Sequence, residues 1–252
     1  MSRIESISVV IPTYNEAENL RLMVAALRSL PIPDLRILVV DDNSPDGTGK
    51  IADDLASVPE NHLTVIHRAG KLGLGTAYRT GFRAALAERT QAVAQMDCDF
   101  SHPPDALLRM ADLLEHCDVA VGSRYIAGGG IDDRWSAGRR WLSLWGSLYS
   151  RLILGLQVKD TTAGFKLWQH EALQGIDLDR IHSNGYVFQV EMAFVAQQLG
   201  YHICETPIHF EDRHIGRSKM SMEIKLEAAW RIWQVWARHR HLRPSDRTTK
   251  QW

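Results

Sequence analysis

The chain has 252 residues, long for one small domain and short for two full ones, and 45% of them are hydrophobic, enough to bury a sizeable core. Its formal net charge of −1 argues against a nucleic-acid-binding protein whose affinity comes from bulk positive charge. Three cysteines, Cys98, Cys117 and Cys204, lack metal-type spacing, so we expect free thiols in a reducing compartment.

The first residues, MSRIESISVVIPTYNE, lack the basic start and long apolar core of a signal peptide. No stretch reaches the roughly 18 uninterrupted apolar residues of a membrane span. We therefore expect a cytoplasmic protein, or one bound peripherally to the cytoplasmic face of a membrane.

Short apolar strands alternate with amphipathic helices through the first half of the chain. The expected strands cover 6–12, 35–42, 63–68, 91–97 and 118–124. The helices between them cover 16–30, 47–57, 75–88 and 104–116. Strands that are apolar nearly throughout and separated by helices predict an α/β fold with a mostly parallel sheet covered on both faces. Ligands of such sheets bind beyond the carboxyl ends of the strands.

The pattern changes after Arg124. The segments expected to be regular are helices over 139–156, 187–199 and 222–241 and strands over 164–169 and 202–210. Loops are expected over the glycine-rich 126–138 and the polar 211–221, and the last residues, 242–252, are expected to be disordered. Without a repeat or a long linker, we expect a catalytic domain over 1–222 and a C-terminal amphipathic helix and tail over 223–252.

Two carboxylates follow the strand expected over 91–97. Asp97 and Asp99 are one residue apart, so in an extended chain they share a face and can converge on one cation. Mg²⁺ and Mn²⁺ take oxygen ligands, and Mg²⁺ commonly also holds substrate phosphates. The pair indicates a divalent-metal site, although a turn with an aspartate cap for the next helix has the same pattern.

Polar residues also end the first two expected strands. Asp42 could accept hydrogen bonds from a nucleobase or ribose, although the following NSPDG would look the same in a purely structural loop. Tyr14 could pack on a base or ribose. Glu16 could cap the following helix or accept a hydrogen bond from a base. These positions indicate a nucleoside site at the same edge as the carboxylate pair.

Basic side chains complete the pattern. Arg124, after the fifth expected strand, could either form a surface ion pair or compensate a metal-bound diphosphate. Arg213 and Lys219 lie in the polar loop, where they could be solvated or close over a phosphate. The order of these groups along the chain favours a nucleoside-diphosphate donor lying across the sheet.

Segments in chain order resemble the family 2 glycosyltransferases of the GT-A fold, and more closely the dolichol- or polyprenol-phosphate mannosyltransferases. They run from about Ile7 to Met222 and include VVIPTYNEAENL, VVDDNSPDGTG, KLGLGTAYRTGF, MDCDFSHPP, VGSRY, DTTAGFKLW and FEDRHIGRSKMS. The resemblance implies inverting, metal-dependent transfer of mannose from GDP-mannose to a polyprenyl phosphate, giving polyprenyl phosphate mannose and GDP.

The same resemblance implies roles for single residues. The positions that match GDP-mannose-binding positions are Pro12, Tyr14, Glu16, Val40, Asp42, Asp97, Cys98, Asp99, Arg124, Arg213 and Lys219. Asp97 and Asp99 match the metal ligands, and with Arg124 they are the implied catalytic residues. Cys98 stands where relatives usually carry alanine, and Ser101 where some place glutamine as a further metal ligand, so no third protein ligand is implied.

The implied acceptor is a lipid phosphate, whose second pKa of about 6 leaves it anionic at neutral pH without a general base. We expect Arg124 and Arg139 to hold this phosphate and Ser143, one helical turn after Arg139, to donate to it. The helices over 139–156 and 222–241 carry tryptophans and basic residues. They could lie on a membrane surface, pack in the core or bind a membrane-anchoring partner protein.

Two alternatives keep the fold. One is a polyprenyl-phosphate glucosyltransferase that uses UDP-glucose, which the match to KLGLGTAYRTG and DRHIGRSK disfavours. The other is a non-catalytic module that only binds nucleotide, against which the intact carboxylate pair argues. A redox Rossmann enzyme is disfavoured because GLGTAYRTG lacks the G-x-G-x-x-G spacing and does not directly follow the first strand.

Overall fold

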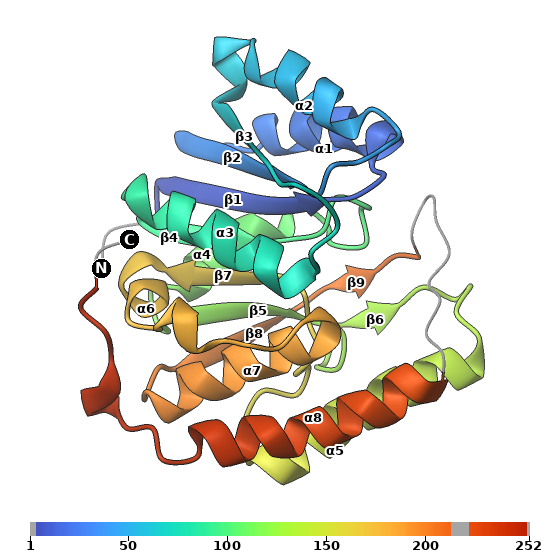
Figure 1. Cartoon of the computed structure of the whole chain (residues 1–252), viewed down its shortest axis with the longest axis vertical. Helices are drawn as coiled ribbons and strands as arrows, with labels where there is room; N and C mark the ends of the chain where they lie inside the picture. Colours follow the sequence, from blue (N-terminus) through green and yellow to red (C-terminus); the bar gives the residue numbers. More distant parts are fainter. Residues whose placement is uncertain (1–3, 213–221, 251–252) are drawn as a thin grey trace.

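The computed structural model describes residues 4–212 and 222–250, and it confirms the α/β class with a mostly parallel sheet (Figure 1). The central seven-stranded sheet has the order β3-β2-β1-β4-β7-β5-β8. Its strands are β1 (Ser6–Thr13), β2 (Asp34–Asp41), β3 (Leu63–His67), β4 (Ala92–Gln95), β5 (Val119–Ser123), β7 (Lys166–Gln169) and β8 (Ile203–Pro207). A second, two-stranded sheet pairs β6 (Gly130–Ile131) with β9 (His209–Phe210).

Helices cover both faces of the central sheet (Figure 1). Their bounds are α1 (Ala17–Arg28), α2 (Thr48–Ala56), α3 (Leu74–Ala87), α4 (Ala106–Leu113), α5 (Ala137–Leu154), α6 (His170–Gln174), α7 (Gly185–Gln198) and α8 (Met222–His239). Short 3₁₀ turns occur at Pro59–Asn61, Leu178–Arg180 and Pro244–Asp246. Within the described ranges, no helix combines the length and the hydropathy needed to cross a bilayer.

Alternation along β1 divides the core into two halves. Val10 is buried with Tyr78 of α3 and Phe188 of α7 on one face of the sheet. Val9 and Ile11 are buried in the separate cluster that α1 and α4 cover on the other face. Because successive side chains point to opposite faces, a strand that is apolar at every position must be covered on both.

One strand runs against the others. β7 lies between β4 and β5 and pairs antiparallel with both. The sequence predicts a strand here, but its pairing partners depend on contacts between distant segments. The consequence is functional, because β7 brings Lys166 between Gln95 and Val121, close behind the segment that carries Asp97.

Two glycines let α3 approach the sheet and α7 closely. A Cβ atom at Gly81 would lie 2.3 Å from Cγ1 of Val10, and one at Gly75 would lie 2.4 Å from the carbonyl oxygen of Ser183. Any side chain at these positions would push α3 outward. Gly75 and Gly81 of the GLGTAYRTG segment therefore allow close packing of α3, the helix that borders the carboxyl ends of β1 and β2.

The expectation of a disordered C-terminus is wrong for residues 242–250. Arg247 donates from Nε to the carbonyl of Leu199 at 2.9 Å, and the Thr248 amide donates to the carbonyl of Gly175 at 2.9 Å. The segment has no apolar periodicity, so sequence pattern alone could not predict its order. It is held instead by hydrogen bonds to carbonyls at the ends of α6 and α7, which lack helical partners.

The C-terminal helix α8 packs into the core of the domain. Ile232 and Val235 of α8 are buried in the same core cluster as α3 and α7, and α8 packs against α5 and α7. A boundary at residue 222 stays a prediction of the sequence.

Candidate active site

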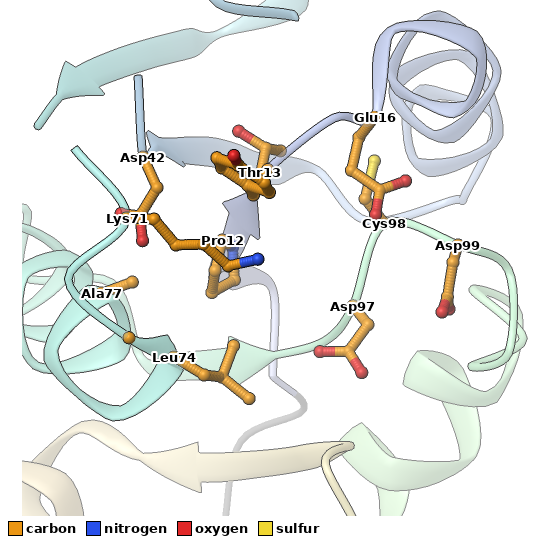
Figure 2. A pocket seen from close by; sticks show the side chains of 12 residues that line it. Pro12, Thr13, Glu16, Asp42, Lys71, Leu74, Ala77, Asp97, Cys98 and Asp99 are labelled. Atoms are coloured by element: carbon orange, nitrogen blue, oxygen red, sulfur yellow. The ribbon is translucent and has the colours of Figure 1, made fainter. Parts of the chain in front are cut away.

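The carboxyl ends of β1, β2 and β4 meet at one pocket (Figure 2). The residues that line it are Pro12, Thr13, Tyr14, Glu16, Asp42, Lys71, Gly73, Leu74, Ala77, Asp97, Cys98 and Asp99. Seven positions that the resemblance assigns to the donor therefore share one pocket, as parallel strands predict. Figure 2 shows Asp97 and Asp99 on one side of this pocket and the Lys71 amine reaching in from the other.

The carboxylate pair is held by hydrogen bonds. Tyr78 donates its hydroxyl to Oδ1 of Asp97 at 3.1 Å, and the Asp97 amide donates to Nδ1 of His102 at 3.0 Å. Ser101 donates its hydroxyl to Oδ1 of Asp99 at 2.6 Å and its amide to the same oxygen at 3.1 Å. A turn is thus present at Asp99, but the aspartate cap predicted as part of the alternative is not, because α4 has Asp105 at its N-cap and no side-chain cap hydrogen bond. The turn orients Asp99, and both carboxylates still line the pocket.

Burial sets the protonation of two groups around the pair. It lowers the pKa of His102, against the opposing effect of Asp97 and Asp99, so the ring is neutral and can accept at Nδ1. It raises the pKa of the Cys98 thiol well above its ordinary value, and the nearby negative charges of Glu16, Asp99 and Asp97 act in the same direction. Cys98 therefore lines the pocket as an un-ionised thiol of low reactivity.

The two acidic residues at the end of β2 have different surroundings. Asp41 accepts from the hydroxyls of Thr13 at 3.0 Å and Ser44 at 2.6 Å, which fixes the turn. Asp42 lines the pocket and forms a buried ion pair with Arg68 at 2.6 Å. Burial raises the pKa of Asp42, and Arg68 opposes this rise. The sequence analysis missed Arg68, because its role depends on a contact with Asp42, 26 residues away in the chain.

Lys71 is a second residue that the sequence analysis missed. Its amine lies 4.0 Å from the ring centroid of Tyr14, a cation–π distance, and both residues line the pocket. Lys71 stands in the KLGLG segment on which part of the resemblance rests, but nothing in its spacing marks it as a ligand. It puts a positive charge opposite Asp97 and Asp99, where an anionic ligand would need one.

Two residues implied by the resemblance lie elsewhere. The Val40 side chain is fully buried in the core under α3 and does not line the pocket, so its side chain is not a nucleoside contact in this structure. Arg124 is also buried and forms a bidentate ion pair with Asp160, with Nε–Oδ2 at 2.7 Å and Nη2–Oδ1 at 2.6 Å. Arg213 and Lys219 lie outside the described residues.

Hydrogen bonds and an opposite charge compensate the buried guanidinium of Arg124. Burial alone lowers the pKa of Arg124, but the adjacent Asp160 carboxylate more than offsets this and raises it. The Arg124 amide also donates to Asp160, at 3.0 Å, and Nη2 donates to the hydroxyl of Thr162 at 2.8 Å. A buried guanidinium needs such partners, which is why it turns toward Asp160 and not toward the pocket.

The two remaining predicted acceptor residues begin α5. Arg139 stacks on Trp135, with its guanidinium carbon 3.6 Å from the ring centroid, and pairs with Asp212 at 2.9 Å. Ser143 accepts a hydrogen bond from the hydroxyl of Tyr125 at 2.7 Å. Arg124 lies 5.1 Å from the centroid of the Tyr125 ring, so contacts connect Arg124 to Ser143 beyond the end of β5.

Lys166 is fully buried behind the carboxylate pair. Its amine donates to the carbonyl of Ala163 at 2.5 Å and to Oε1 of Gln189 at 2.7 Å. Burial lowers the pKa of Lys166 to about 7, Arg124 adds to the decrease, and Asp160 and Asp97 oppose it. A lysine in an apolar strand gives no sequence signal of its charge state, because that state depends on packing.

Lys166 is expected to make stability depend on pH. In the unfolded chain its pKa returns to an ordinary value near 10.4, so between about pH 7 and that value the unfolded state binds the extra proton. The free energy of unfolding of the wild type, relative to Lys166→Met, should rise by roughly 1 kcal/mol per pH unit from pH 7 to 9 and be flat below. Urea unfolding at several pH values measures this difference.

Lys50→Met, at an exposed position of α2, is the control and should show no such slope. A pH-independent difference between the wild type and Lys166→Met would contradict the lowered pKa.

The two carboxylates fit a metal ion that takes its remaining ligands from the substrate and from water. Among the described residues, no group of three or more His, Cys, Asp or Glu side chains is placed to hold a metal ion. Asp97 and Asp99 together would offer two carboxylates, and water and phosphate oxygens would supply the rest. This is how Mg²⁺ is usually bound in sites that handle phosphates.

The architecture is the GT-A fold. Glucosyl-3-phosphoglycerate synthase from Mycobacterium tuberculosis, solved with Mn²⁺ and UDP-glucose, matches with a TM-score of 0.65 at 18% identity, over 93% of this chain and 79% of that one. The mannosyltransferase PcManGT from Pyrobaculum calidifontis, solved with GDP-Man and Mn²⁺, matches with a TM-score of 0.58 at 18% identity, over 86% and 59%. At these identities the matches establish the fold.

The chain belongs to glycosyltransferase family 2, whose family model matches residues 8–177. It is 42% identical to a polyprenol monophosphomannose synthase of Mycolicibacterium smegmatis, over 89% of this chain and 84% of that protein. It is 44% identical to an undecaprenyl-phosphate mannosyltransferase of Micrococcus luteus, over 93% and 96%. The predicted family and fold are confirmed.

Proposed function

We propose that this protein transfers mannose from GDP-mannose to a polyprenyl phosphate, with inversion at the anomeric carbon and with Mg²⁺ or Mn²⁺ as cofactor. The observation that carries the proposal is the 44% identity, over 93% of the chain, to an undecaprenyl-phosphate mannosyltransferase. The pocket supports the proposal physically. The carboxylates of Asp97 and Asp99 suit a metal ion, Glu16 and Asp42 can accept hydrogen bonds from a nucleoside, and Lys71 can compensate a phosphate charge.

The donor would lie across the carboxyl ends of β1, β2 and β4. Tyr14, Glu16 and Asp42 suit the nucleoside, with Asp42 oriented by Arg68. Asp97 and Asp99 would hold the divalent ion against the diphosphate, where it would stabilise the negative charge of departing GDP. Lys71 is placed to add charge compensation from the opposite wall.

The acceptor needs positioning more than activation. A phosphate monoester is already anionic at neutral pH, so the protein must bring two anions into line and neutralise both. The Arg139 side chain, 36% exposed, suits the acceptor phosphate, and Ser143 follows it on α5. Arg124 forms its ion pair with Asp160, so we do not assign it a direct contact with the phosphate. We propose instead that it packs against Tyr125, whose hydroxyl donates to Ser143.

A lipid acceptor requires a way to meet the membrane. α5 and α8 lie side by side at one end of the molecule (Figure 1). They expose large apolar side chains: Trp141, Leu144, Trp145, Leu148 and Leu152 on α5, and Trp230 and Trp233 on α8. Tryptophan-rich helices with nearby arginines are typical of surfaces that lie in the lipid headgroup layer. We assign this face, which begins at Arg139, to membrane contact.

The double variant Trp141→Glu and Leu152→Glu is expected to weaken binding to anionic liposomes by at least about tenfold, because each exposed apolar side chain that enters the bilayer is worth roughly 1.5–3 kcal/mol. Co-sedimentation with the full chain measures it. Substitution is a sharper test than removal of α8, which contributes Ile232 and Val235 to the core.

Leu22→Glu is the matched control, since Leu22 is 62% exposed on α1 at the other end of the molecule (Figure 1). Unchanged liposome binding by the double variant would remove this face from the account.

One assay tests the function as a whole. Purified protein, polyprenyl phosphate and a divalent ion are supplied with GDP-mannose or UDP-glucose in parallel, with EDTA added in a third arm. We expect a mannosylated lipid with GDP-mannose and no product with EDTA. Glucose transfer without mannose transfer would overturn the donor assignment, and no transfer from either donor would overturn the proposed function.

A further inference from the structure

A buried tyrosine reaches the first aspartate of the pair. Tyr78 of α3 is fully buried, and its hydroxyl donates to Oδ1 of Asp97 at 3.1 Å. Its ring stacks on Phe82, with centroids 5.6 Å apart, and on Phe188 of α7, with centroids 5.7 Å apart and the planes 2° from parallel. The ring therefore has little freedom, and the direction of its hydroxyl is set by α3 and α7.

We propose that Tyr78 is a positioning residue that holds the Asp97 carboxylate in the orientation that receives the divalent cation. The inference rests on the proposed function, because the cation is the one that transfer requires. A hydrogen bond from outside the metal shell fixes the rotamer of a ligand before the ion arrives. Tyr78 would act through Asp97, without touching the substrate.

Other contacts of Asp97 agree with a ligand that is fixed in advance. Its backbone amide donates to His102, whose ring stacks on Phe165 at a centroid distance of 5.2 Å. Gly164 lies beside the second carboxylate oxygen, since a Cβ atom there would be 3.7 Å from Oδ2 of Asp97. One oxygen is thus held by Tyr78. Gly164 leaves room for the His102 ring, since a Cβ atom there would also lie 3.0 Å from Cε1 of His102.

The variant Tyr78→Phe isolates the hydroxyl, because phenylalanine keeps the ring between Phe82 and Phe188. With the full chain and GDP present, we expect Mn²⁺ affinity, measured by electron paramagnetic resonance, to fall about tenfold. The Mn²⁺ concentration that gives half-maximal transfer should rise by the same factor, while kcat at saturating Mn²⁺ stays within about threefold. GDP binding in EDTA, measured by calorimetry, should not change.

Tyr201→Phe is the matched control. This variant also loses a largely buried hydroxyl, but that hydroxyl donates to the carbonyl of Glu171 at 3.5 Å and not to a carboxylate of the pair. The thermal midpoints of both variants show whether the fold is kept. Phe188→Leu, which loosens the packing of the Tyr78 ring but keeps the hydroxyl, is a second test and is expected to weaken Mn²⁺ binding in the same direction.

Two results would overturn the inference. One is Mn²⁺ affinity within twofold of the wild type in Tyr78→Phe, and the other is an equal loss of GDP binding in EDTA, which would mean that Tyr78 shapes the pocket and not the carboxylate. If the wild type itself binds no Mn²⁺ with GDP, the metal role in the proposed function fails as well, so the two failures are distinguishable.

Discussion

Asp99→Ala is expected to reduce transfer by about a thousandfold or more while the protein stays folded. The substitution removes one of the two carboxylates that would hold the cation against the diphosphate. The substitution also removes two hydrogen bonds that the Asp99 carboxylate accepts from Ser101, two residues along the same turn. Loss of this local turn should cost about 1 kcal/mol. Initial rates with saturating GDP-mannose and circular dichroism measure the two effects.

Asp54→Ala provides the control for the loss of a carboxylate. Asp54 lies on α2 outside the pocket, where it forms an exposed ion pair with Arg21 at 3.4 Å. Its removal should leave transfer unchanged. Asp99→Ala turnover near that of the wild type would refute the role of the carboxylate pair.

Asp160→Ala is expected to lower the free energy of unfolding by about 3–5 kcal/mol, the typical cost of leaving a buried charge without its partner. Asp160 is fully buried and accepts three hydrogen bonds from Arg124. Asp160 also influences the pKa of Lys166, so the loss would leave two buried basic groups, Arg124 and Lys166, without this carboxylate. Urea unfolding at pH 7 measures the change.

Asp160→Asn separates charge from shape, because the amide can still accept hydrogen bonds but leaves Arg124 uncompensated. It should recover only part of the loss. Asp54→Ala, which breaks an exposed pair, should cost about 0.5 kcal/mol or less. If Asp160→Ala cost no more than Asp54→Ala, the Arg124 pair would not be a structural element.

Predictions that depended on local pattern were reliable here. The strand before Asp97 and the turn after it follow from an apolar run ended by Asp, Ser and Pro residues. Parallel strands then bring their carboxyl ends to one edge, which explains why Tyr14, Asp42 and Asp97 line one pocket. The carboxylate pair itself indicated a divalent metal. The sugar and the lipid came from the resemblance, because residue types at strand ends do not distinguish one nucleotide sugar from another.

Predictions about single cations and about the tail were weaker. Arg124 was expected near a phosphate, but burial makes it pair with Asp160, which lies 36 residues further along the chain. Tyr78 and Lys166 were not predicted at all, although both lie next to or behind the carboxylate pair. Their roles depend on which distant segments become neighbours, and sequence patterns of one helix or one strand contain no such information.

The amino-acid sequence by itself determined the alternation of strands and helices, the α/β class and the placement of acidic groups at strand ends, because each depends on residues close together in the chain. Only the tertiary structure decided that β7 enters antiparallel between β4 and β5 and that Tyr78 and His102 hold Asp97. It also decided that α8 packs on α5 and α7. These features depend on burial and on hydrogen bonds between distant segments. Such contacts form, and stabilise the protein, only when folding brings those segments together.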